Sequence, residues 1–387
     1  MLRLADVVRR HGPAYLARHQ GAILPSHCRA MTAITNCRTP ALGAHLGVCA
    51  RCDHRHLLYH SCRHRACARC GFDATERWLE HQRDLLLPVA YYHVVFTLPS
   101  ELRRLVRQHQ RALIDVLFRS AYAALAQLAA DQRYLGGQIG VLAVLHTWTR
   151  ALVYHPHVHM IVPGGALAAD GTWHPVPRRR RRFLVPVKPL ARLFAGKFLA
   201  AARQVLPGVT IPSLRAGTRW VVYAKPVVHG NDAILRYLGR YVHRTAITDG
   251  ALIACTDHAV TFRYRDHRDR RTKQMTLPPN EFLRRFLQHV LPRGLHRVRT
   301  YGLLHSGNRH LLRRLQLLLT PNGEPEPRRS GRALRTLRCP RCRHGSLVLT
   351  DRLSREQCLT QLLANTAPTA RAPPRQPSHP STHHGAS

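Results

Sequence analysis

The cysteines restrict the fold of this chain more than any other feature of its sequence. Seven of the eleven cysteines fall between Cys28 and Cys70. Cys49-Ala-Arg-Cys52 and Cys67-Ala-Arg-Cys70 form a C-x2-C-x14-C-x2-C spacing. Each C-x2-C turn can present two thiolates to one tetrahedral ion, so two turns complete a closed site. We therefore predict a structural Zn²⁺ site formed by Cys49, Cys52, Cys67 and Cys70, with Cys37, His45, Cys62 and His64 as alternative or second-site ligands.

A reducing compartment is assumed for these thiols. No apolar run approaches the roughly 20 residues that span a bilayer, and no signal peptide is visible at the start. We therefore expect a cytoplasmic protein without membrane association, in which disulfides are rare. Cys339-Pro-Arg-Cys342 is an isolated half-site, weak as a metal site unless His344 or Cys358 contributes.

The charge of the chain indicates a polyanionic partner. Lys and Arg number 60 against 20 Asp and Glu, a formal net charge of +40. Such an excess repels itself, and nucleic acid is the simplest partner to neutralise it. Arginine supplies nearly all of the charge and forms bidentate contacts with phosphate. The run of Arg178, Arg179, Arg180, Arg181 and Arg182 is accordingly predicted to be a DNA-binding loop.

Two further patterns suggest chemistry on a phosphate. His155-Pro-His-Val-His159 continues into an alternating strand, and period-2 geometry places His157 and His159 on one face. Two imidazoles on a rigid strand can bind a divalent metal. Downstream, Tyr237 and Tyr241 lie at i and i+4 of a helix-like run, so both phenols share one face. Together these patterns predict metal-assisted phosphoryl transfer with a tyrosine nucleophile.

Arginines follow the same helix-like run. Arg236, Arg240 and Arg244 recur every four residues, which indicates a face that contacts phosphate. Each pattern has an alternative interpretation. The arginines could form a stripe that is merely solvated, the tyrosines could pack in the core, and the histidine pair could be a coincidence. The conjunction of these patterns with the strand Tyr92–Leu98 favours the functional interpretation.

The order of predicted elements indicates an α+β fold. From about residue 90 it runs strand, helix, two strands, helix, strand, helix, two strands, which suits an antiparallel sheet with flanking helices. The helices include Thr75–Leu87 and a single long helix over Leu102–Ala130; Asp266–Lys273 is a charged loop. Three domains are expected: 1–85 with N-terminal helices and a zinc-binding module, 86–310 as the catalytic domain, and 311–387 as a basic extension disordered from about 366.

Six stretches of the chain together form a specific set of motifs. They are Cys37-Arg-Thr39, Ser61-Cys-Arg-His-Arg-Ala-Cys-Ala-Arg-Cys70, Tyr92-His-Val-Val-Phe-Thr-Leu-Pro99, His155-Pro-His-Val-His-Met-Ile-Val-Pro-Gly-Gly165, Tyr237-Leu-Gly-Arg-Tyr-Val-His-Arg244 and Glu281-Phe-Leu-Arg-Arg-Phe286. In the order and spacing of these motifs the chain resembles the rolling-circle insertion-sequence transposases, two-tyrosine members of the HUH endonuclease superfamily. The resemblance covers roughly residues 20–310.

The resemblance implies an HUH-type sheet and a DNA transposase associated with the bacterial nucleoid. His157 and His159 match the family's metal ligands for Mg²⁺ or Mn²⁺, and Tyr237 and Tyr241 match its nucleophiles. The implied reaction cleaves single-stranded DNA at the element ends through a 5′-phosphotyrosyl intermediate. Because Mg²⁺ prefers oxygen ligands, phosphate and water oxygens are expected to complete the shell. A third protein ligand is expected as well, with His146 as the candidate and His155 behind it.

Two other functions remain open from the sequence alone. A plasmid replication initiator or relaxase would use the same metal and tyrosine chemistry, although the N-terminal cysteine module argues against it. A non-catalytic, zinc-bearing DNA-binding protein from a decayed element is the other alternative. The presence of both histidines and both tyrosines counts against decay.

Overall fold

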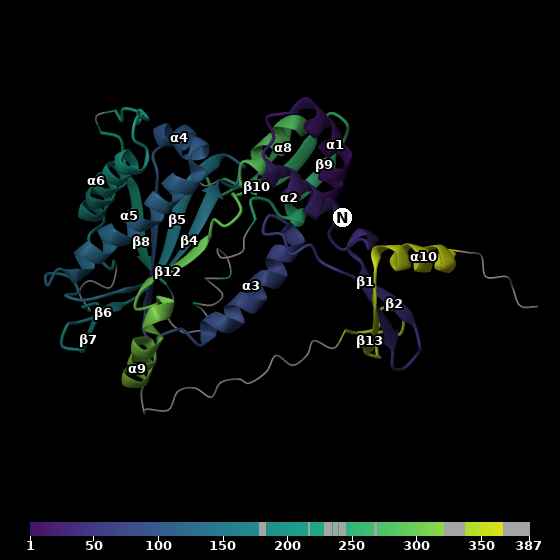
Figure 1. Cartoon of the computed structure of the whole chain (residues 1–387). Coiled ribbons are helices and arrows are strands. Elements are labelled where there is room, and N and C mark those ends of the chain that lie inside the picture. Colours follow the sequence, from purple (N-terminus) through teal and green to yellow (C-terminus); the bar gives the residue numbers. More distant parts are fainter. Residues whose placement is uncertain are drawn as a thin grey trace, which may run out of the picture. The chain divides into compact units, whose positions relative to one another are not determined.

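The structure is a computed structural model that describes residues 1–177, 183–215, 217–227, 234, 239, 245–266, 269–320 and 337–366. The chain forms two compact units (Figure 1). The larger unit comprises Met1–Cys37 and Ser61–Leu334, and the smaller unit comprises Arg38–His60 and Arg335–Ser387. This division differs from the predicted ranges 1–85, 86–310 and 311–387, because an early segment and the C-terminal segment fold together.

The larger unit is built on a five-stranded antiparallel sheet with the order β12-β4-β5-β3-β8. The predicted α+β class with antiparallel sheets and flanking helices is confirmed. In chain order the strands are β3 (Tyr91–Thr97), β4 (Gly140–Trp148), β5 (Tyr154–Pro163), β8 (Val221–Pro226) and β12 (Val298–Gly302). β-branched and aromatic residues dominate β3, which pairs with β5 from Tyr91↔Pro163 to Thr97↔His157.

One face of this sheet is covered by the helices α5 (Gln110–Ala130) and α6 (Val187–Val205). Alternate strand residues such as Phe96, Val158 and Met160 point into this core, where Phe96 meets Phe194 of α6 at 5.0 Å between ring centroids. By the period-2 rule, the intervening residues point to the opposite face. We call this opposite face the histidine face; it carries Tyr91, His93, Leu142, Val144, His146, His157, His159 and Ile161.

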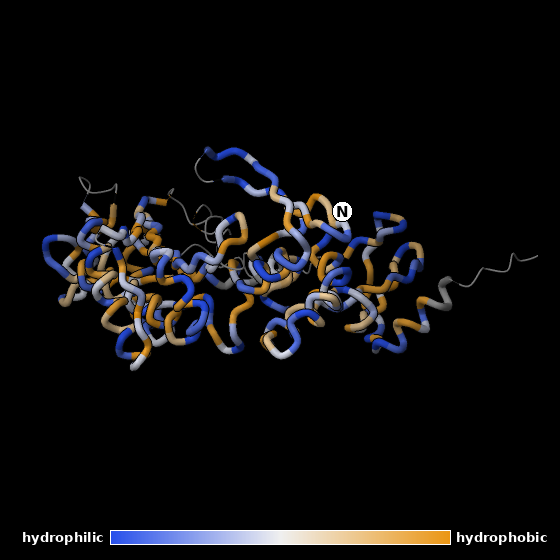
Figure 2. The backbone as a smooth tube through the Cα atoms, turned by 90° about the horizontal axis from the view of Figure 1, so that it is seen from above, coloured by the Kyte–Doolittle hydropathy of each residue, from blue (hydrophilic) through white to orange (hydrophobic). Residues whose placement is uncertain are grey.

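Helix α5 has the length and composition of a membrane-spanning helix, but 61% of its most apolar window is buried inside the protein. Its buried residues, including Leu113, Leu117 and Leu125, belong to the core of the central sheet. Hydrophilic and hydrophobic segments alternate along the described backbone (Figure 2). Burial against the sheet accounts for the apolar composition of α5.

The prediction of a single helix over Leu102–Ala130 is wrong. The structure divides it into η2 (Ser100–Leu102), α4 (Arg103–Gln108) and α5, with His109 between α4 and α5 at φ −114° and ψ 46°. These angles lie outside the α-helical region. Helical spacing of apolar residues continues through the break, so periodicity alone could not reveal it.

The larger unit also contains a three-stranded sheet with the order β11-β10-β9. Its strands are β9 (Leu252–Cys255), β10 (Val260–Arg265) and β11 (Thr272–Leu277), and η4 (Asp249–Ala251) precedes them. Helices α1 (Leu4–Arg18), α2 (Pro25–Asn36) and α8 (Pro279–Leu287) pack with this sheet in one buried cluster. The predicted charged loop over Asp266–Lys273 overlaps the start of β11. The sequence did not indicate this strand, because most of its residues are polar and exposed.

The remaining elements of the larger unit flank the central sheet. Helix α3 (Ala68–Arg83) begins seven residues before the predicted Thr75 and ends before Leu87, and its Leu79 packs with residues of the histidine face. The hairpin β6 (Gly165–Leu167) and β7 (Trp173–Pro175) follows β5. After β12 come η5 (Ser306–Asn308) and α9 (Arg309–Leu319), whose Leu312 and Leu315 are buried against Leu87.

The smaller unit contains a three-stranded antiparallel sheet with the order β13-β1-β2. Strands β1 (Ala44–Cys49) and β2 (Arg55–Tyr59) form a hairpin after η1 (Pro40–Leu42), and β13 (Leu347–Leu353) pairs with β1. Helix α10 (Arg355–Thr366) follows β13. Residues 367–387, where disorder was expected, lie outside the described residues.

Candidate functional site

Three histidines converge on the histidine face of the central sheet. His146 of β4 lies directly opposite His157 of β5, and His159 follows two residues later on the same face. Their ligand atoms lie within 4.8 Å of one another. The ring centroids of His146 and His159 are 4.5 Å apart, and those of His157 and His159 are 4.9 Å apart. The structure thus brings together the two predicted ligands and His146, the predicted third; we call them the histidine group.

The neighbours of the histidine group orient its rings. His157 Nδ1 lies 2.7 Å from the backbone oxygen of His155, so Nδ1 carries the proton and Nε2 holds the lone pair. His159 Nδ1 lies 2.8 Å from His93 Nε2. Trp148 stacks on His146 with 4.6 Å between the ring centroids. Such contacts behind the ligands are typical of metal-binding histidines, because they set the tautomer and the ring orientation.

His93, which sequence reasoning did not select, is buried in β3 beside the histidine group. Burial is the largest cause that lowers the pKa of His93 to about 3, with smaller contributions from Lys225 and His157. His93 is therefore neutral, and its Nε2 can accept the Nδ1 proton of His159. That arrangement presents the lone pair of His159 Nε2 to a cation. The alternation Tyr91, His93, Val95 along β3 could have revealed it from the sequence.

His155, the second candidate for the third ligand, does not join the histidine group. Its ring lies 5.2 Å from that of His157, but its Nδ1 lies 2.9 Å from an Nη of Arg103. A guanidinium only donates hydrogen bonds, so His155 Nδ1 accepts from Arg103, and its lone pair is engaged in that hydrogen bond. His146 is geometrically the better third ligand.

The other predicted residues of the cleavage site lie outside the described residues: Tyr237, Tyr241, Arg178, Arg179, Arg180, Arg181, Arg182, Arg236, Arg240 and Arg244. Ile234 and Gly239 are the described residues between positions 228 and 244. Ile234 is buried in one cluster with Leu142, Val144 and Ile161 of the histidine face. A Cβ built on Gly239 would lie 3.0 Å from Leu79 of α3, which packs with that cluster.

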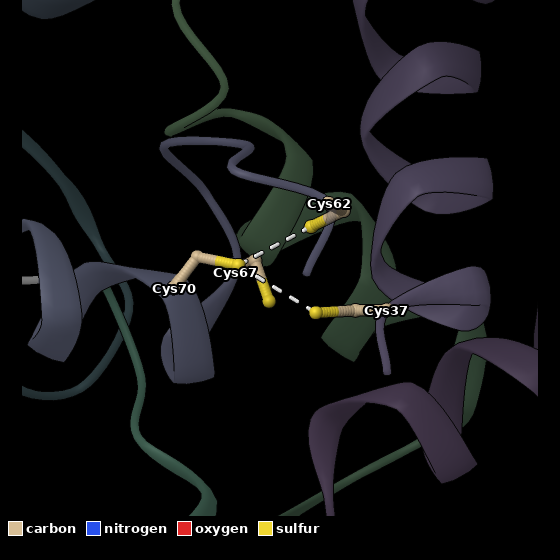
Figure 3. Close-up of side chains that lie close together, drawn as sticks. All are labelled: Cys37, Cys62, Cys67 and Cys70. Atoms are coloured by element: carbon tan, nitrogen blue, oxygen red, sulfur yellow. Dashed lines mark hydrogen bonds between the residues drawn. The ribbon is translucent and has the colours of Figure 1, made fainter. Parts of the chain in front are cut away.

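A first group of thiols lies in the larger unit. Cys37 at the end of α2, Cys62, Cys67 at the N-cap of α3 and Cys70 in its first turn have sulfur atoms within 4.8 Å of one another. The four side chains converge (Figure 3), with Cys70 Sγ 3.5 Å from Cys37 Sγ and 3.6 Å from Cys62 Sγ. A tetrahedral zinc site with bonds of about 2.3 Å separates its sulfurs by about 3.8 Å, so this group has the dimensions of one.

A second group of thiols lies in the smaller unit and corrects the predicted ligand set. Cys49 and Cys52 lie with Cys339 and Cys342, not with Cys67 and Cys70. The β1–β2 hairpin carries the first pair and faces the segment that precedes β13, whereas the N-terminus of α3 carries Cys67 and Cys70 toward Cys37 and Cys62. The predicted site of Cys49, Cys52, Cys67 and Cys70 is therefore replaced by two groups. Cys37 and Cys62 complete the first.

Hydrogen bonds within the groups favour the thiolate, the form of cysteine that binds metal, at some cysteines and oppose it at others, since they raise the pKa of Cys62 and Cys67. Hydrogen bonds from Cys37, Cys62 and Cys67 lower the pKa of Cys70. The pKa of Cys37 is lowered to about 7, chiefly by its hydrogen bond with Cys62. In the second group, the backbone N–H of Gly345 donates to Cys342 Sγ at 3.3 Å and is the largest cause that lowers the pKa of Cys342 to about 6.

The backbone next to these cysteines has an unusual conformation. Six described non-glycine residues have positive φ, and four of them directly follow a cysteine of the two groups: Arg38, Asp53, Arg63 and Arg343. A side chain in this left-handed region costs about 1–2 kcal/mol. Strain repeated at equivalent positions indicates turns shaped to direct backbone N–H groups at sulfur, as at His64 N to Cys62 Sγ, 3.5 Å.

Comparison with protein families gives two matches. Residues 140–310, which include the histidine group, match a family described as "Putative transposase". Residues 7–98 match the "Transposase zinc-binding domain", a range that includes all of the first thiol group and only Cys49 and Cys52 of the second. Together with the thiol geometry, this match supports structural zinc in the chain.

Two relatives extend the comparison over most of the chain. "Putative transposase y4qJ" of Sinorhizobium fredii (strain NBRC 101917 / NGR234) is 40% identical over 384 residues, covering 90% of this chain and 94% of the relative. "Transposase for insertion sequence element IS801" of Pseudomonas savastanoi pv. phaseolicola is 31% identical over 298 residues, covering 74% of this chain and 72% of the relative. No solved structure matches. The chain belongs to the rolling-circle insertion-sequence transposase family of the IS91 and IS801 type, and DNA is therefore its partner.

Proposed function

We propose that this transposase moves an insertion sequence by cleaving and rejoining single-stranded DNA at the element ends, with a divalent cation at the histidine group and a tyrosine nucleophile. The observation that carries the proposal is the convergence of His146, His157 and His159 on one rigid sheet face. Contacts from His93 and the His155 carbonyl set the rings so that the Nε2 atoms of His159 and His157 can serve as ligands.

The donor set fits such a cation. His146, His157 and His159 would hold the cation, and water and phosphate oxygens would supply its other ligands. Imidazole nitrogen suits Mn²⁺ better than Mg²⁺, which prefers oxygen, so we expect the tighter binding for Mn²⁺. When bound, the cation would withdraw charge from the scissile phosphate and stabilise the charge that develops there.

Tyr237 and Tyr241 are the proposed nucleophiles. One phenol oxygen forms a bond to phosphorus, the bond from phosphorus to the 3′ oxygen breaks, and the phenol proton is lost as the 3′-OH gains one. The products are a 5′-phosphotyrosyl link and a free 3′-OH, which preserve the phosphodiester energy for rejoining. Ile234 and Gly239 support this assignment, because they pack with residues of the histidine face or with α3 beside it.

Two sets of arginines in the sequence are proposed to hold the DNA. Arg236, Arg240 and Arg244 recur beside the tyrosines, and Arg178–Arg182 form a continuous positive run. Backbone contacts of this kind fix the register of a strand without selecting its sequence. Cys37, Cys62, Cys67 and Cys70 are the proposed ligands of the structural zinc ion of the zinc-binding domain, which adds folding energy to the α1 and α2 region.

The test incubates the full chain with single-stranded oligonucleotides tiled across the DNA that flanks its gene, in the presence of Mn²⁺. We expect cleavage that disappears in His157→Ala and His146→Ala and on addition of a chelator. His174→Ala is the matched control: this histidine of β7 contacts the backbone oxygen of Leu135, outside the histidine group. Cleavage that survives both histidine substitutions would sink the metal assignment. A protein that binds these oligonucleotides but never cleaves them would instead match the non-catalytic alternative.

A further inference from the structure

The second thiol group contains residues that neither family match covers. The matched ranges are 7–98 and 140–310, whereas Cys339 and Cys342 lie beyond both. Cys52 and Cys339 are 287 positions apart in the chain, yet their sulfur atoms lie 3.8 Å apart. Cys49 Sγ and Cys342 Sγ are 3.7 Å apart. We propose that Cys49, Cys52, Cys339 and Cys342 bind a second structural Zn²⁺ ion, which joins the C-terminal segment to the β1–β2 hairpin.

The distances distinguish a metal site from a disulfide. Cysteines that form a disulfide have sulfurs about 2.05 Å apart, whereas all four thiols here are free. The observed separations of 3.7 and 3.8 Å equal those of a tetrahedron with metal–sulfur bonds of about 2.3 Å. Four thiolates and no open position describe a closed structural site, and soft sulfur ligands favour zinc among the common divalent ions.

Two turns of the same construction face each other in this group. Cys49-Ala-Arg-Cys52-Asp-His54 and Cys339-Pro-Arg-Cys342-Arg-His344 share one pattern, Cys-x-Arg-Cys-x-His. In each turn the fifth residue donates its N–H to the carbonyl of the first cysteine, at 3.1 Å for Asp53 and 2.9 Å for Arg343. That fifth residue has positive φ in both turns, 50° and 61°. The two turns are therefore structural equivalents, each presenting two sulfurs.

Close packing around the sulfurs supports the same assignment. Backbone N–H groups of Arg51 and Gly345 donate to Cys49 Sγ and Cys342 Sγ at 3.4 and 3.3 Å. A Cβ at Gly345 would lie 2.5 Å from Cys49 Sγ, so the approach of the two turns requires glycine there. Charge-assisted hydrogen bonds from the backbone stabilise thiolates ahead of metal binding.

The smaller unit has little apolar packing around this thiol group, as expected where a bound metal adds stability. In its described part, the buried cluster at this position contains only Cys49, Cys339 and Leu347, with Cys52, Leu58 and Cys342 partly buried around them. Val348 and Leu349 of β13 are 55% and 49% exposed. Small domains with so little apolar core are commonly held by metals or disulfides. Bound zinc contributes folding free energy directly, because the unfolded chain has no preformed site.

The experiment measures zinc bound to the purified full chain by elemental mass spectrometry. We expect about two zinc ions per chain, one for each closed four-thiolate site. The double variant Cys339→Ser with Cys342→Ser should retain only the zinc ion of the first group. The double variant Cys67→Ser with Cys70→Ser should retain only the zinc ion of the second group. Cys28→Ser is the matched control, since Cys28 lies in α2 outside both groups. A single zinc ion in the native chain, or two in the Cys339/Cys342 variant, would overturn the proposal.

A second measurement uses the unaltered chain, in case a variant fails to fold. Native protein is treated with an alkylating reagent before and after a zinc chelator, and each cysteine is quantified by peptide mass spectrometry. The proposal predicts that Cys52 and Cys342, which are only half-buried, react at least tenfold faster once zinc is removed. Equal rates with and without the chelator would contradict it. Neither result bears on DNA cleavage, so the proposed function stands or falls separately.

Discussion

His93 shows how one buried side chain can set the properties of the proposed cation site. Its Nε2 lies 2.8 Å from His159 Nδ1, and the two rings are nearly parallel, with 5.0 Å between their centroids. Removing such a partner behind a ligand typically weakens metal binding by about 10–100-fold. His93→Ala should raise the Mn²⁺ concentration needed for half-maximal cleavage by that factor, and saturating Mn²⁺ should restore cleavage. An unchanged Mn²⁺ dependence would show that His93 only fills space.

Backbone strain at Arg343 offers a second test on a single residue. Its φ of 61° costs an L side chain about 1–2 kcal/mol, whereas glycine adds about 0.5–1 kcal/mol of unfolded-state entropy. Arg343→Gly should therefore raise the stability of the zinc-loaded chain by roughly 0.5 kcal/mol, measured by thermal unfolding. Arg341→Gly is the matched control, an exposed arginine of the same turn without positive φ, and it should be destabilising. Equal losses at both positions would refute the strain argument.

At the scale of elements, the edge strand β12 depends on Gly302. This glycine has φ 57°, and a Cβ there would overlap the carbonyl oxygen of Ile139, the residue before β4. Gly302→Ala should therefore destabilise the protein for two reasons: the alanine would have to adopt a left-handed conformation, and β12 would have to shift away from β4. Gly171→Ala is the control, because Gly171 has φ 83° with nothing within 4 Å of its Cβ. Gly302→Ala should cost about 1–3 kcal/mol more by denaturant unfolding. Equal losses of unfolding free energy in the two variants would show that β12 can shift without loss of stability.

The elements that could be predicted from the sequence are those with a strong period. β3, β4 and β5 alternate or run apolar throughout, and the positions of His157 and His159 on one face follow from that period. The break at His109 interrupts no apolar pattern, so it was missed. β13 was missed as well, because five of its seven residues are exposed and it depends on pairing with β1. Its pairing partner lies about three hundred residues away, beyond the reach of any local pattern.

The cysteine ligand sets illustrate the same limit. C-x2-C pairs are recognised locally, and neighbouring pairs are naturally joined into one site, as Cys49, Cys52, Cys67 and Cys70 were. The smaller unit instead combines Arg38–His60 with the C-terminal segment, so the pairs are exchanged. One signal in the sequence could have indicated this exchange, namely the Cys-x-Arg-Cys-x-His pattern shared by residues 49–54 and 339–344.

At the scale of the whole molecule, a net charge of +40 predicts DNA binding that weakens steeply with salt. Each phosphate contact with single-stranded DNA contributes about 0.7 to the slope of log affinity against log salt. Replacing Arg178–Arg182 with serine should reduce that slope by up to about 3.5, measured by fluorescence anisotropy. Arg133→Ser is the control, because its guanidinium already pairs with Asp131 at 2.7 Å. An unaltered slope in the five-serine variant would mean that the run does not contact DNA.

The proposed covalent link between a tyrosine of this chain and DNA at the histidine group can be measured directly. Trypsin separates the two candidates, since Tyr237-Leu-Gly-Arg240 and Tyr241-Val-His-Arg244 are different peptides. The full chain is incubated with Mn²⁺ and oligonucleotides from the element ends, denatured, digested with trypsin and nuclease, and examined by peptide mass spectrometry. We expect a nucleotide joined through a 5′ phosphate to Tyr237 or Tyr241, absent in His157→Ala. A nucleotide on any other residue, or a cleaved strand with both tyrosines unmodified throughout the time course, would contradict it.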